Sequence, residues 1–414
     1  MHDLTLPDSP VEYGRILGAQ WQGRLASRVR AATARLAAAG EPPPTEIARR
    51  IAAFRDLLGS FRPEWLEELG GIARGAGVSE DDILLLNAVP IPDARASEGN
   101  CTSFAMVGDD RTALFKIRDE RPHPQVFYAY RDRRGRVIHA GKEIGNLGIA
   151  HGIAENGICG GNNTGSRVGD ISPEPRFTDC HMLRYLVEEA ETVADVEPLL
   201  AAAYDAGVVG GASADRGMIL LAADGAATVC AELSGTNFVV RRFEAGAHAF
   251  SNHFQTDEAR GWVTTEDGEN SRTRLSRMQE LLADVTWMSV ENDARGMARD
   301  TANAPDSLCN DDSATAGMTV SAQLHLQLQH GPSWSHICCG HPRNSVFLTV
   351  PVGIQDVPAP LVSGEVFDWA NALYRARGSG DHLCPVQDRL EGASYSTGSA
   401  DYRSILSSFL AEAA

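Results

Sequence analysis

Long apolar runs are absent from this chain of 414 residues. No apolar stretch approaches the length of about 18 to 20 residues that a membrane-spanning helix needs, so we expect no membrane partner. The opening segment, "MHDLTLPDSPVEYGRILG", lacks the basic start and the apolar stretch of a secretory signal. The sequence therefore predicts a cytoplasmic protein.

Basic residues are scarce relative to acidic ones. Lys and Arg number 37 and Asp and Glu number 55, which gives a formal net charge of -18 at pH 7. Such a chain is repelled by nucleic acid and by anionic membrane surfaces. We therefore expect small-molecule partners and no nucleic-acid partner, while the oligomeric state is left open.

Cysteine is sparse as well, with eight residues in the whole chain. That is too few for a disulfide scaffold, so we expect reduced thiols. The segment "SWSHICCGHP" brings His336, Cys338, Cys339 and His341 close together in sequence. Neighbouring cysteines on a strand point to opposite faces, so we expect no metal site there. The Gly-rich segments "GICGG" and "GVVGGAS" do not match a phosphate loop, and we expect no cofactor.

Helical and strand-like patterns divide the chain at Cys101. Residues 10–92 have apolar positions at helical spacing, and the Pro- and Gly-rich segment "PIPDARASEGN" follows them. From Cys101 onward, short strand-like runs alternate with helical segments near 178–204 and 270–299, and a loop-and-helix tail begins at about 352. The hairpin-like spacing predicts an α+β fold with antiparallel sheets and helices on their outer faces. His325, in "LHLQLQH", is expected on the polar face of a half-buried strand.

Cys101 lies at the change of pattern, in "EGNCTSFAMVG". A thiolate is a strong nucleophile, but its thiol needs a base or a lowered pKa. If the preceding peptide bond is cut, the new α-amine of Cys101 can act as that base, because its ordinary pKa is about 7.7–8.0. The alternative is that Cys101 is a small buried hydrophobic residue at the start of a strand.

Several segments in a fixed order carry a family resemblance. They are "SPVEYGRILGAQWQGRL", "WLEELGGIARGAGVSEDDILLLNA", "CTSFAMV", "HGIAENGICGGNNTG", "FSNHF" and "NAPDSLCN". Together, over residues 10–350, they resemble the isopenicillin N acyltransferase family of N-terminal-nucleophile (Ntn) hydrolases. Members of that family cut themselves before a cysteine, which then becomes the catalytic residue.

The resemblance implies a fold and a division of the chain. The expected fold is a four-layer αββα sandwich with an N-terminal helical prosegment. Cleavage between Asn100 and Cys101 would leave residues 1–100 as a small subunit bound to residues 101–414, the catalytic large subunit, with the extension from about 352. The family usually has Gly before its nucleophile, where this chain has Asn100.

The resemblance also implies roles for individual residues. Cys101 is the expected nucleophile, Asp119 and Arg118 are expected to support the site, and Asn252 is the expected oxyanion donor. Asn162 and Asn163 are expected to line the acyl or leaving-group pocket. Asn310, a further expected substrate-site residue, stands where the family's acyltransferase has Arg, so the substrate class does not carry over.

Three functions remain open at this point. The favoured one is a self-cleaving amidohydrolase that splits a linear amide, such as an N-acyl amine or a secondary-metabolite amide, through an acyl-Cys101 intermediate. An N-acyltransferase that moves an acyl group from a CoA thioester or an amide to an amine is the alternative. The third is an uncleaved, non-catalytic relative that only binds a ligand.

Overall fold

The computed structural model describes residues 6–40, 42–89, 91, 101–266, 268–311, 317–378, 387 and 389–392. Asn100, the residue before the predicted cut, lies outside the described residues. The helices are α1 (Pro10–Ala39), α2 (Pro44–Phe61), α3 (Pro63–Ala76), α4 (Glu80–Ala88), α5 (Asp179–Glu189), α6 (Val196–Asp205), α7 (Asp257–Arg260), α8 (Glu269–Leu282), α9 (Val290–Ala298), α10 (Ala359–Ser363) and α11 (Glu365–Arg377), with a short 3₁₀ turn at Val193–Asp195.

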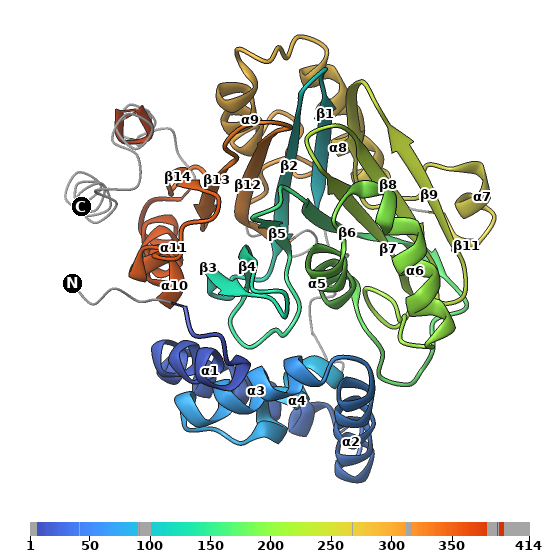
Figure 1. The fold of residues 1–414 in the computed structure, drawn as a ribbon, viewed down its shortest axis with the longest axis vertical. Coiled ribbons are helices and arrows are strands. Elements are labelled where there is room, and N and C mark those ends of the chain that lie inside the picture. The colour runs from blue at the N-terminus through green and yellow to red at the C-terminus, as the bar shows by residue number, and fades with distance from the viewer. Residues whose placement is uncertain are drawn as a thin grey trace.

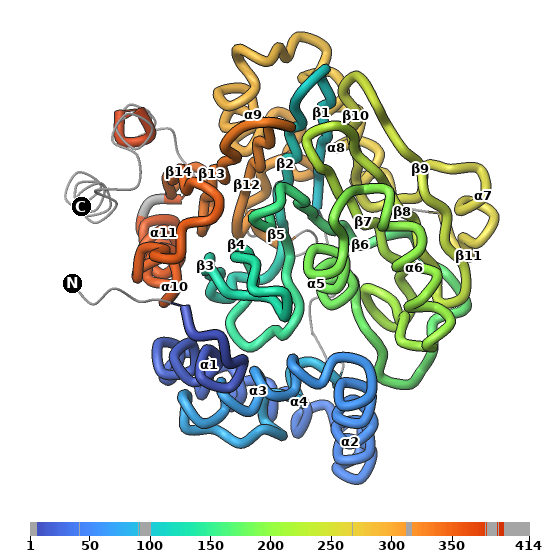
Figure 2. The backbone as a smooth tube through the Cα atoms, in the orientation of Figure 1, coloured from blue at the N-terminus to red at the C-terminus, as the bar shows by residue number. Residues whose placement is uncertain are grey.

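Fourteen strands within the described residues form two antiparallel sheets (Figures 1 and 2). One sheet has the order β10-β1-β2-β12-β13-β14, and the other has the order β3-β4-β5-β6-β7-β8-β9, with β11 paired to β6. The strands are β1 (Thr102–Val107), β2 (Arg111–Glu120), β3 (Gln125–Arg131), β4 (Val137–Glu143), β5 (His151–Ala154), β6 (Cys159–Val168), β7 (Arg216–Ala223), β8 (Thr228–Leu233), β9 (Phe238–Phe243), β10 (Gly246–Phe250), β11 (Val263–Thr265), β12 (Met318–Leu328), β13 (Trp334–Cys339) and β14 (Leu348–Pro351). The predicted α+β class with antiparallel sheets is confirmed.

The two sheets pack face to face, with helices against their outer faces. Ala105 and Leu114 of the six-stranded sheet share a core with Ile219 and Leu221 of the other. Residues of α8 and α9 form a second core with β1, β2 and β12 on the outer side of the six-stranded sheet. Apolar side chains of α5 and α6 pack with β7 and β8 on the outer side of the other sheet. None of the helices in the described ranges is long and apolar enough to cross a bilayer.

The four N-terminal helices form a group at one end of the molecule (Figure 1). Pro10 and Gly40 mark the ends of α1, because proline suits the first turn of a helix and Gly40 adopts φ 70 at the cap. Helices α1 and α3 lie close enough that a Cβ on Gly14 would lie 2.1 Å from the Glu68 carbonyl oxygen. A larger residue at Gly14 would therefore separate the two helices.

One expectation about the strands is wrong. His325 was expected on a half-buried strand, but it is 1% exposed. Its Nε2 lies 3.3 Å from His151 Nδ1 of the opposite sheet, and its Nδ1 lies 2.8 Å from the Ser335 hydroxyl. The polar face of β12 is therefore covered by the second sheet. A period-two pattern shows which residues share a face, but it does not show what covers that face.

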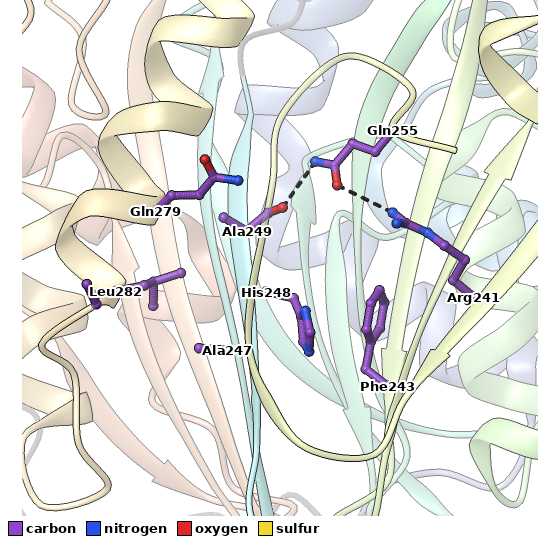
Figure 3. A pocket seen from close by; sticks show the side chains of 9 residues that line it. Arg241, Phe243, Ala247, His248, Ala249, Gln255, Gln279 and Leu282 are labelled. Atoms are coloured by element: carbon purple, nitrogen blue, oxygen red, sulfur yellow. Dashed lines mark hydrogen bonds between the residues drawn. The ribbon is translucent and has the colours of Figure 1, made fainter. Parts of the chain in front are cut away.

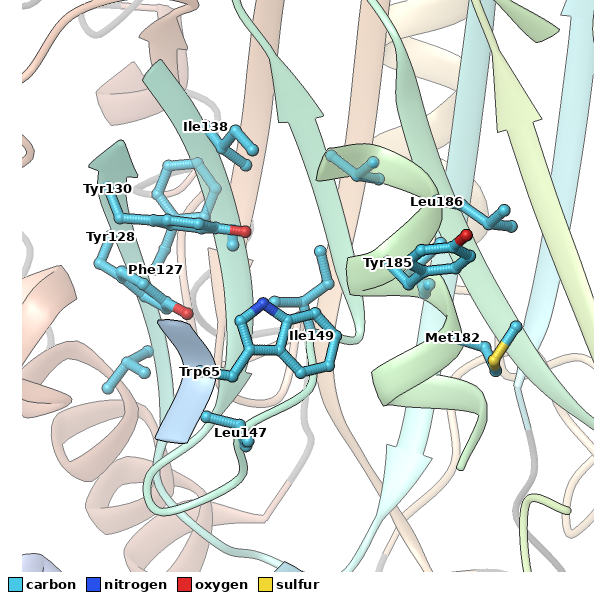
Figure 4. Packing of buried hydrophobic residues seen from close by; sticks show 14 of the residues in the cluster. Trp65, Phe127, Tyr128, Tyr130, Ile138, Leu147, Ile149, Met182, Tyr185 and Leu186 are labelled. Carbon is cyan, nitrogen blue, oxygen red and sulfur yellow. The ribbon is translucent and has the colours of Figure 1, made fainter. Parts of the chain in front are cut away.

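Buried charges join the N-terminal helices to α5. Arg184 of α5 contacts Glu68 of α3 at 2.5 Å and Glu188 at 2.6 Å. Arg62, between α2 and α3, contacts Glu188 at 2.5 Å, and Trp65 Nε1 donates to the same carboxylate at 2.8 Å. Figure 4 shows Trp65 among buried aromatic and aliphatic side chains of the β3–β5 region and α5. This junction combines apolar packing with ion pairs from which water is excluded.

We predict that Arg184→Ala lowers the free energy of unfolding by about 3–5 kcal/mol, because it leaves the buried Glu68 carboxylate without its arginine and removes one of the two arginines that pair with Glu188. Urea denaturation followed by circular dichroism measures the change. Arg49→Ala is the matched control, since Arg49 pairs with Glu46 and Glu174 on the exposed surface. Equal unfolding midpoints for the two variants would contradict a stabilising role for the junction.

A second prediction concerns acid. Burial lowers the pKa of His139 to about 4, and those of His181, His325 and His336 to about 3; it also lowers that of His151. In the unfolded chain these side chains bind protons near their ordinary pKa of 6.5. The unfolded state therefore binds more protons below that pH, and stability rises with pH.

We expect the free energy of unfolding to fall as the pH is lowered from about 7 to about 5. Asp119, Glu120 and Asp179 act in the opposite direction, because burial raises the pKa of each carboxyl group. The five histidines outnumber them. Urea titrations at the two pH values provide the measurement, and equal or greater stability at the lower pH would show that the buried histidines do not control the acid response.

Candidate active site

Cys101 lies directly before β1, the strand between β10 and β2 in the six-stranded sheet. Its side chain is 4% exposed. In the β1–β2 register Thr102 is opposite Ile117, so Cys101 lies near Arg118. Burial raises the pKa of the Cys101 thiol, and the positive charge of Lys116 is the largest opposing influence. The thiol therefore needs a proton acceptor before it can attack a substrate.

Arg274 of α8 binds the start of β1. Its Nη1 donates to the Cys101 carbonyl oxygen at 2.7 Å and to the Thr102 hydroxyl at 2.6 Å. Its Nη2 donates to Asn252 Oδ1 at 2.8 Å. The guanidinium is fully buried, which lowers its pKa, and the charge of Asp119 is the largest opposing influence. One side chain thus holds both Cys101 and Asn252 in position.

Sequence reasoning missed Arg274. The available signal was that Arg274 occupies a core position of α8, together with Met278 and Leu282 one and two turns later. A charged residue at such a position must find buried partners, because an unpaired charge in the interior is strongly unfavourable. The partners themselves could not be identified, since Cys101 lies 173 residues away in sequence.

Asn252 follows β10 and is 3% exposed. Its backbone N–H donates to the Ser271 hydroxyl at 2.9 Å, and its Nδ2 donates to the Thr164 carbonyl at 2.8 Å. An amide nitrogen carries two hydrogens, so a second N–H of Asn252 can serve as a donor. Two hydrogen bonds fix the side chain and one fixes the backbone of Asn252, which suits a preorganised donor.

Asp119 of β2 is fully buried. Its carboxylate accepts hydrogen bonds from the Thr319 hydroxyl at 2.6 Å and from Asn310 Nδ2 at 2.7 Å. Burial raises the pKa of Asp119 to about 7, against the lowering effects of the Arg274 charge and these two hydrogen bonds. Asn310, expected at the substrate, thus donates to Asp119 and helps to orient it.

Arg118 lies on the side of β2 that faces the second sheet. It donates from Nη1 to Gln125 Oε1 at 2.8 Å. Its Nη2 lies 3.4 Å from Glu120 and 3.6 Å from Glu143. The guanidinium is therefore held by neighbouring strands. Its charge acts against the rise in the Cys101 pKa that burial causes.

The two predicted asparagines of β6 bond to different parts of the site. Asn163 Oδ1 accepts from the Ser103 hydroxyl at 2.9 Å, and its Nδ2 donates to the Ser251 carbonyl at 3.0 Å. Asn162 accepts from Lys116 Nζ at 2.7 Å through Oδ1, and its backbone carbonyl also contacts Nζ. Both amides thus connect the two sheets around Cys101.

Lys116 is the second residue that sequence reasoning missed. It is 2% exposed, and it is one of only two lysines in the chain. The other, Lys142, lies over the rings of Trp21 and Tyr128. Composition alone could have drawn attention to Lys116, because the chain has only two lysines and uses arginine elsewhere.

The structure thus brings the predicted residues into one connected region. Arg274 joins Cys101 to Asn252, and its charge acts on Asp119, which accepts hydrogen bonds from Thr319 and Asn310. Asn163 belongs to this region through its hydrogen bond with Ser103, two residues after Cys101. Asn162 accepts a hydrogen bond from Lys116, and the charges of Lys116 and Arg118 both act on the Cys101 thiol. The catalytic and substrate-binding roles of these residues stay predictions.

Two cavities lie near this region. The cavity in Figure 3, of about 380 Å³, lies between β9, β10 and α8, where Gln255 bonds to Arg241 and to the Ala249 carbonyl. A cavity of about 410 Å³ lies between α1 and the sheets, with Arg28 and Arg35 on one side and Glu120 and Glu143 on the other. The second adjoins the catalytic region, because both glutamates pair with Arg118.

Within the part of the chain that the structure describes, no group of three or more His, Cys, Asp or Glu side chains could hold a metal ion. Cys338 belongs to the core beneath α9, whereas its neighbour Cys339 belongs to the core on the other side.

No protein-family model matches the sequence, and no curated protein matches it. Among solved structures, penicillin V acylase from Agrobacterium tumefaciens is similar with a TM-score of 0.44 and 10% identity, over 61% of this chain and 86% of that chain. A conjugated bile acid hydrolase variant from Clostridium perfringens has a TM-score of 0.36 and 8% identity, over 60% and 92%. A Caenorhabditis elegans N-acylethanolamine-hydrolyzing acid amidase ortholog has a TM-score of 0.35 and 11% identity, over 56% of this chain and 94% of that chain. All three similarities are distant, with TM-scores below 0.5 and identities of 8–11%.

We predict that Lys116→Met slows alkylation of Cys101 by iodoacetamide about tenfold at a pH near 8, because loss of the nearby positive charge raises the thiol pKa. Peptide mapping of the alkylated protein gives the rate for Cys101 alone. Lys142→Met is the control, since it removes a lysine that is buried elsewhere. If the two variants react at the same rate, the charge of Lys116 does not act on Cys101.

Proposed function

We propose that this protein is a self-cleaving amidohydrolase of the Ntn type, in which Cys101 attacks a linear amide. The observation that carries the proposal is the buried guanidinium of Arg274, which binds the Cys101 carbonyl and the Asn252 side chain together. A cysteine that was only a core residue would not need a buried charge to hold its backbone beside a preorganised amide donor.

Cleavage before Cys101 accounts for how the thiol is activated. Burial raises the pKa of the thiol, so a neutral thiol predominates near pH 7. The α-amine released by cutting the Asn100–Cys101 bond has an ordinary pKa of about 7.7–8.0 and is attached to the same residue. It takes the thiol proton while sulfur attacks the substrate carbonyl carbon.

The reaction then follows in two steps. The carbonyl oxygen gains negative charge in the tetrahedral intermediate, and the second N–H of Asn252 stabilises it. The α-ammonium returns its proton to the departing amine, and an acyl-Cys101 thioester remains. A water molecule, deprotonated by the α-amine, attacks this thioester and releases the carboxylic acid and the free thiol.

Asp119 and Arg274 act as positioning residues in this proposal. Arg274 orients the start of β1 and Asn252, and Asp119 balances its charge from the neighbouring strand. The Asp119 carboxylate is in turn fixed by Thr319 and Asn310. The charge that neutralises Arg274 thus lies on a side chain that is itself held by hydrogen bonds.

The substrate is proposed to enter through the cavity between α1 and the sheets. Its walls include Arg28 of the N-terminal helices and Glu143 of β4, which pair at 2.5 Å. Residues 1–100 therefore form part of the site and stay bound to residues 101–414 after cleavage. The buried ion pairs of Arg184 with Glu68 and Glu188 support this retention.

Intact mass spectrometry tests the proposal. The wild-type chain should separate under denaturing conditions into two fragments split between Asn100 and Cys101, whereas Cys101→Ala should remain one chain of 44.4 kDa. Arg274→Lys should cut itself about 100-fold more slowly, because lysine cannot reproduce three hydrogen bonds from one planar group.

The matched control is Arg272→Lys, an exposed arginine two residues away on the same helix, which should cut itself at the wild-type rate. An uncut wild-type chain, or equal rates for the two lysine variants, would overturn the proposal. Once a cleaved amide is found, the free acid and any new amide formed with an added amine separate hydrolysis from acyl transfer.

A further inference from the structure

A further cavity lies at the end of the six-stranded sheet that is far from Cys101. It has a volume of about 470 Å³ and lies between α9 and the ends of β2, β12, β13 and β14. Arg111, at its edge, is seven residues before Arg118 on β2, which corresponds to about 23 Å along an extended strand. The cavity is therefore separate from the catalytic region.

The walls of this cavity are mostly aromatic and aliphatic. Trp287 and Trp334 contribute their indole rings, and Val290 and Leu326 contribute branched aliphatic side chains. Such walls favour a flat apolar group, which gains contact area and displaces water from apolar surface.

Two polar groups meet inside these walls, and the buried nitrogen of one of them has no hydrogen-bond partner. His336 is 5% exposed, and its Nε2 makes no hydrogen bond. Glu291 Oε2 lies 3.7 Å from that nitrogen, beyond hydrogen-bond distance. A buried polar atom without a partner is unfavourable, so this pair is suited to receive a donor from a ligand.

The chemistry of the two groups favours a cationic donor. Burial keeps the His336 ring neutral, with a pKa of about 3, and its Nδ1 lies 3.1 Å from the Thr349 hydroxyl. In the tautomer in which Nδ1 donates to the Thr349 hydroxyl, Nε2 is an acceptor, and the Glu291 carboxylate is an acceptor in either tautomer. Glu291 is also the one carboxylate among the lining residues; burial raises its pKa, and the charge of Arg295 on the same helix opposes that rise. Arg111 pairs with Asp110 at 2.8 Å.

The aromatic walls add to this preference for a cation. The Arg111 guanidinium already lies 5.6 Å from the Trp287 ring centroid, so a positive charge is held against one indole of the cavity. Trp334 offers a second indole for the ligand. Aromatic faces attract cations most strongly where water is excluded.

We propose that the cavity between α9 and this end of the sheet is a second ligand site, which binds a primary amine attached to a flat apolar group. The ammonium group donates to Glu291 and His336, and the apolar group lies between Trp334 and the aliphatic side chains. This site is independent of the proposed reaction at Cys101, because none of its lining residues hydrogen-bonds to Cys101, Asn252 or Asp119.

Isothermal titration calorimetry of the full chain with 2-phenylethylamine tests this proposal. 2-Phenylethanol and phenylacetate, which keep the ring but carry a neutral or an anionic group, are titrated in parallel. The amine should bind saturably and at least tenfold more tightly than either analogue, because hydrogen bonds to charged groups are stronger than neutral ones. Equal or tighter binding of either analogue would overturn the proposed ligand class.

Three variants locate the site. Glu291→Gln should weaken amine binding at least tenfold, and Trp334→Leu should weaken it as well, whereas Glu258→Gln, an exposed glutamate on α7, should leave it unchanged. Thermal unfolding identifies a variant that fails to fold. If one of the two cavity variants, Glu291→Gln or Trp334→Leu, fails to fold, the amine affinity of the other one tests the site. No saturable binding to the wild-type chain, or unchanged affinity in a folded cavity variant, would refute the site.

Discussion

The buried guanidinium of Arg274 is the interaction on which the candidate active site depends. It joins three segments that are distant in sequence: the start of β1, helix α8 and the turn after β10. A charge without access to water requires partners of good geometry, and here these are the Cys101 carbonyl, the Thr102 hydroxyl, the Asn252 amide and the Asn270 amide, with Asp119 as the balancing charge. The same constraint fixes the nucleophile and the proposed oxyanion donor relative to each other.

Paired buried charge also occurs where the N-terminal helices meet α5. Arg184 and Arg62 lie between Glu68, Glu188 and Glu189, all of which are buried. These pairs bind the N-terminal helices to the rest of the fold without a covalent bond. In the proposed mechanism this matters, because the chain is cut between the two parts, and α1 also contributes a wall of the cavity next to Arg118.

The sequence predicted the α+β class and the change from helices to strands near Cys101, because helical and strand periods differ along the chain. The resemblance also directed attention to Asp119 and Asn252, which the structure brings to the same guanidinium. Arg274 and Lys116 were missed, since their partners lie on other elements and strand register cannot be obtained from one sequence. The buried position of His325 was missed for a similar reason: the pattern of β12 does not reveal that the second sheet covers its polar face.

In the proposed mechanism, Cys101 becomes an N-terminal residue with a free amine next to its thiol. The most direct measurement is labelling of the denatured protein with 2-cyanobenzothiazole, which reacts selectively with a thiol and an amine on the same terminal cysteine. We expect one labelled peptide, beginning with the sequence "CTSFAMVG". Absence of the label, together with recovery of an intact peptide containing "EGNCTS", would contradict the account.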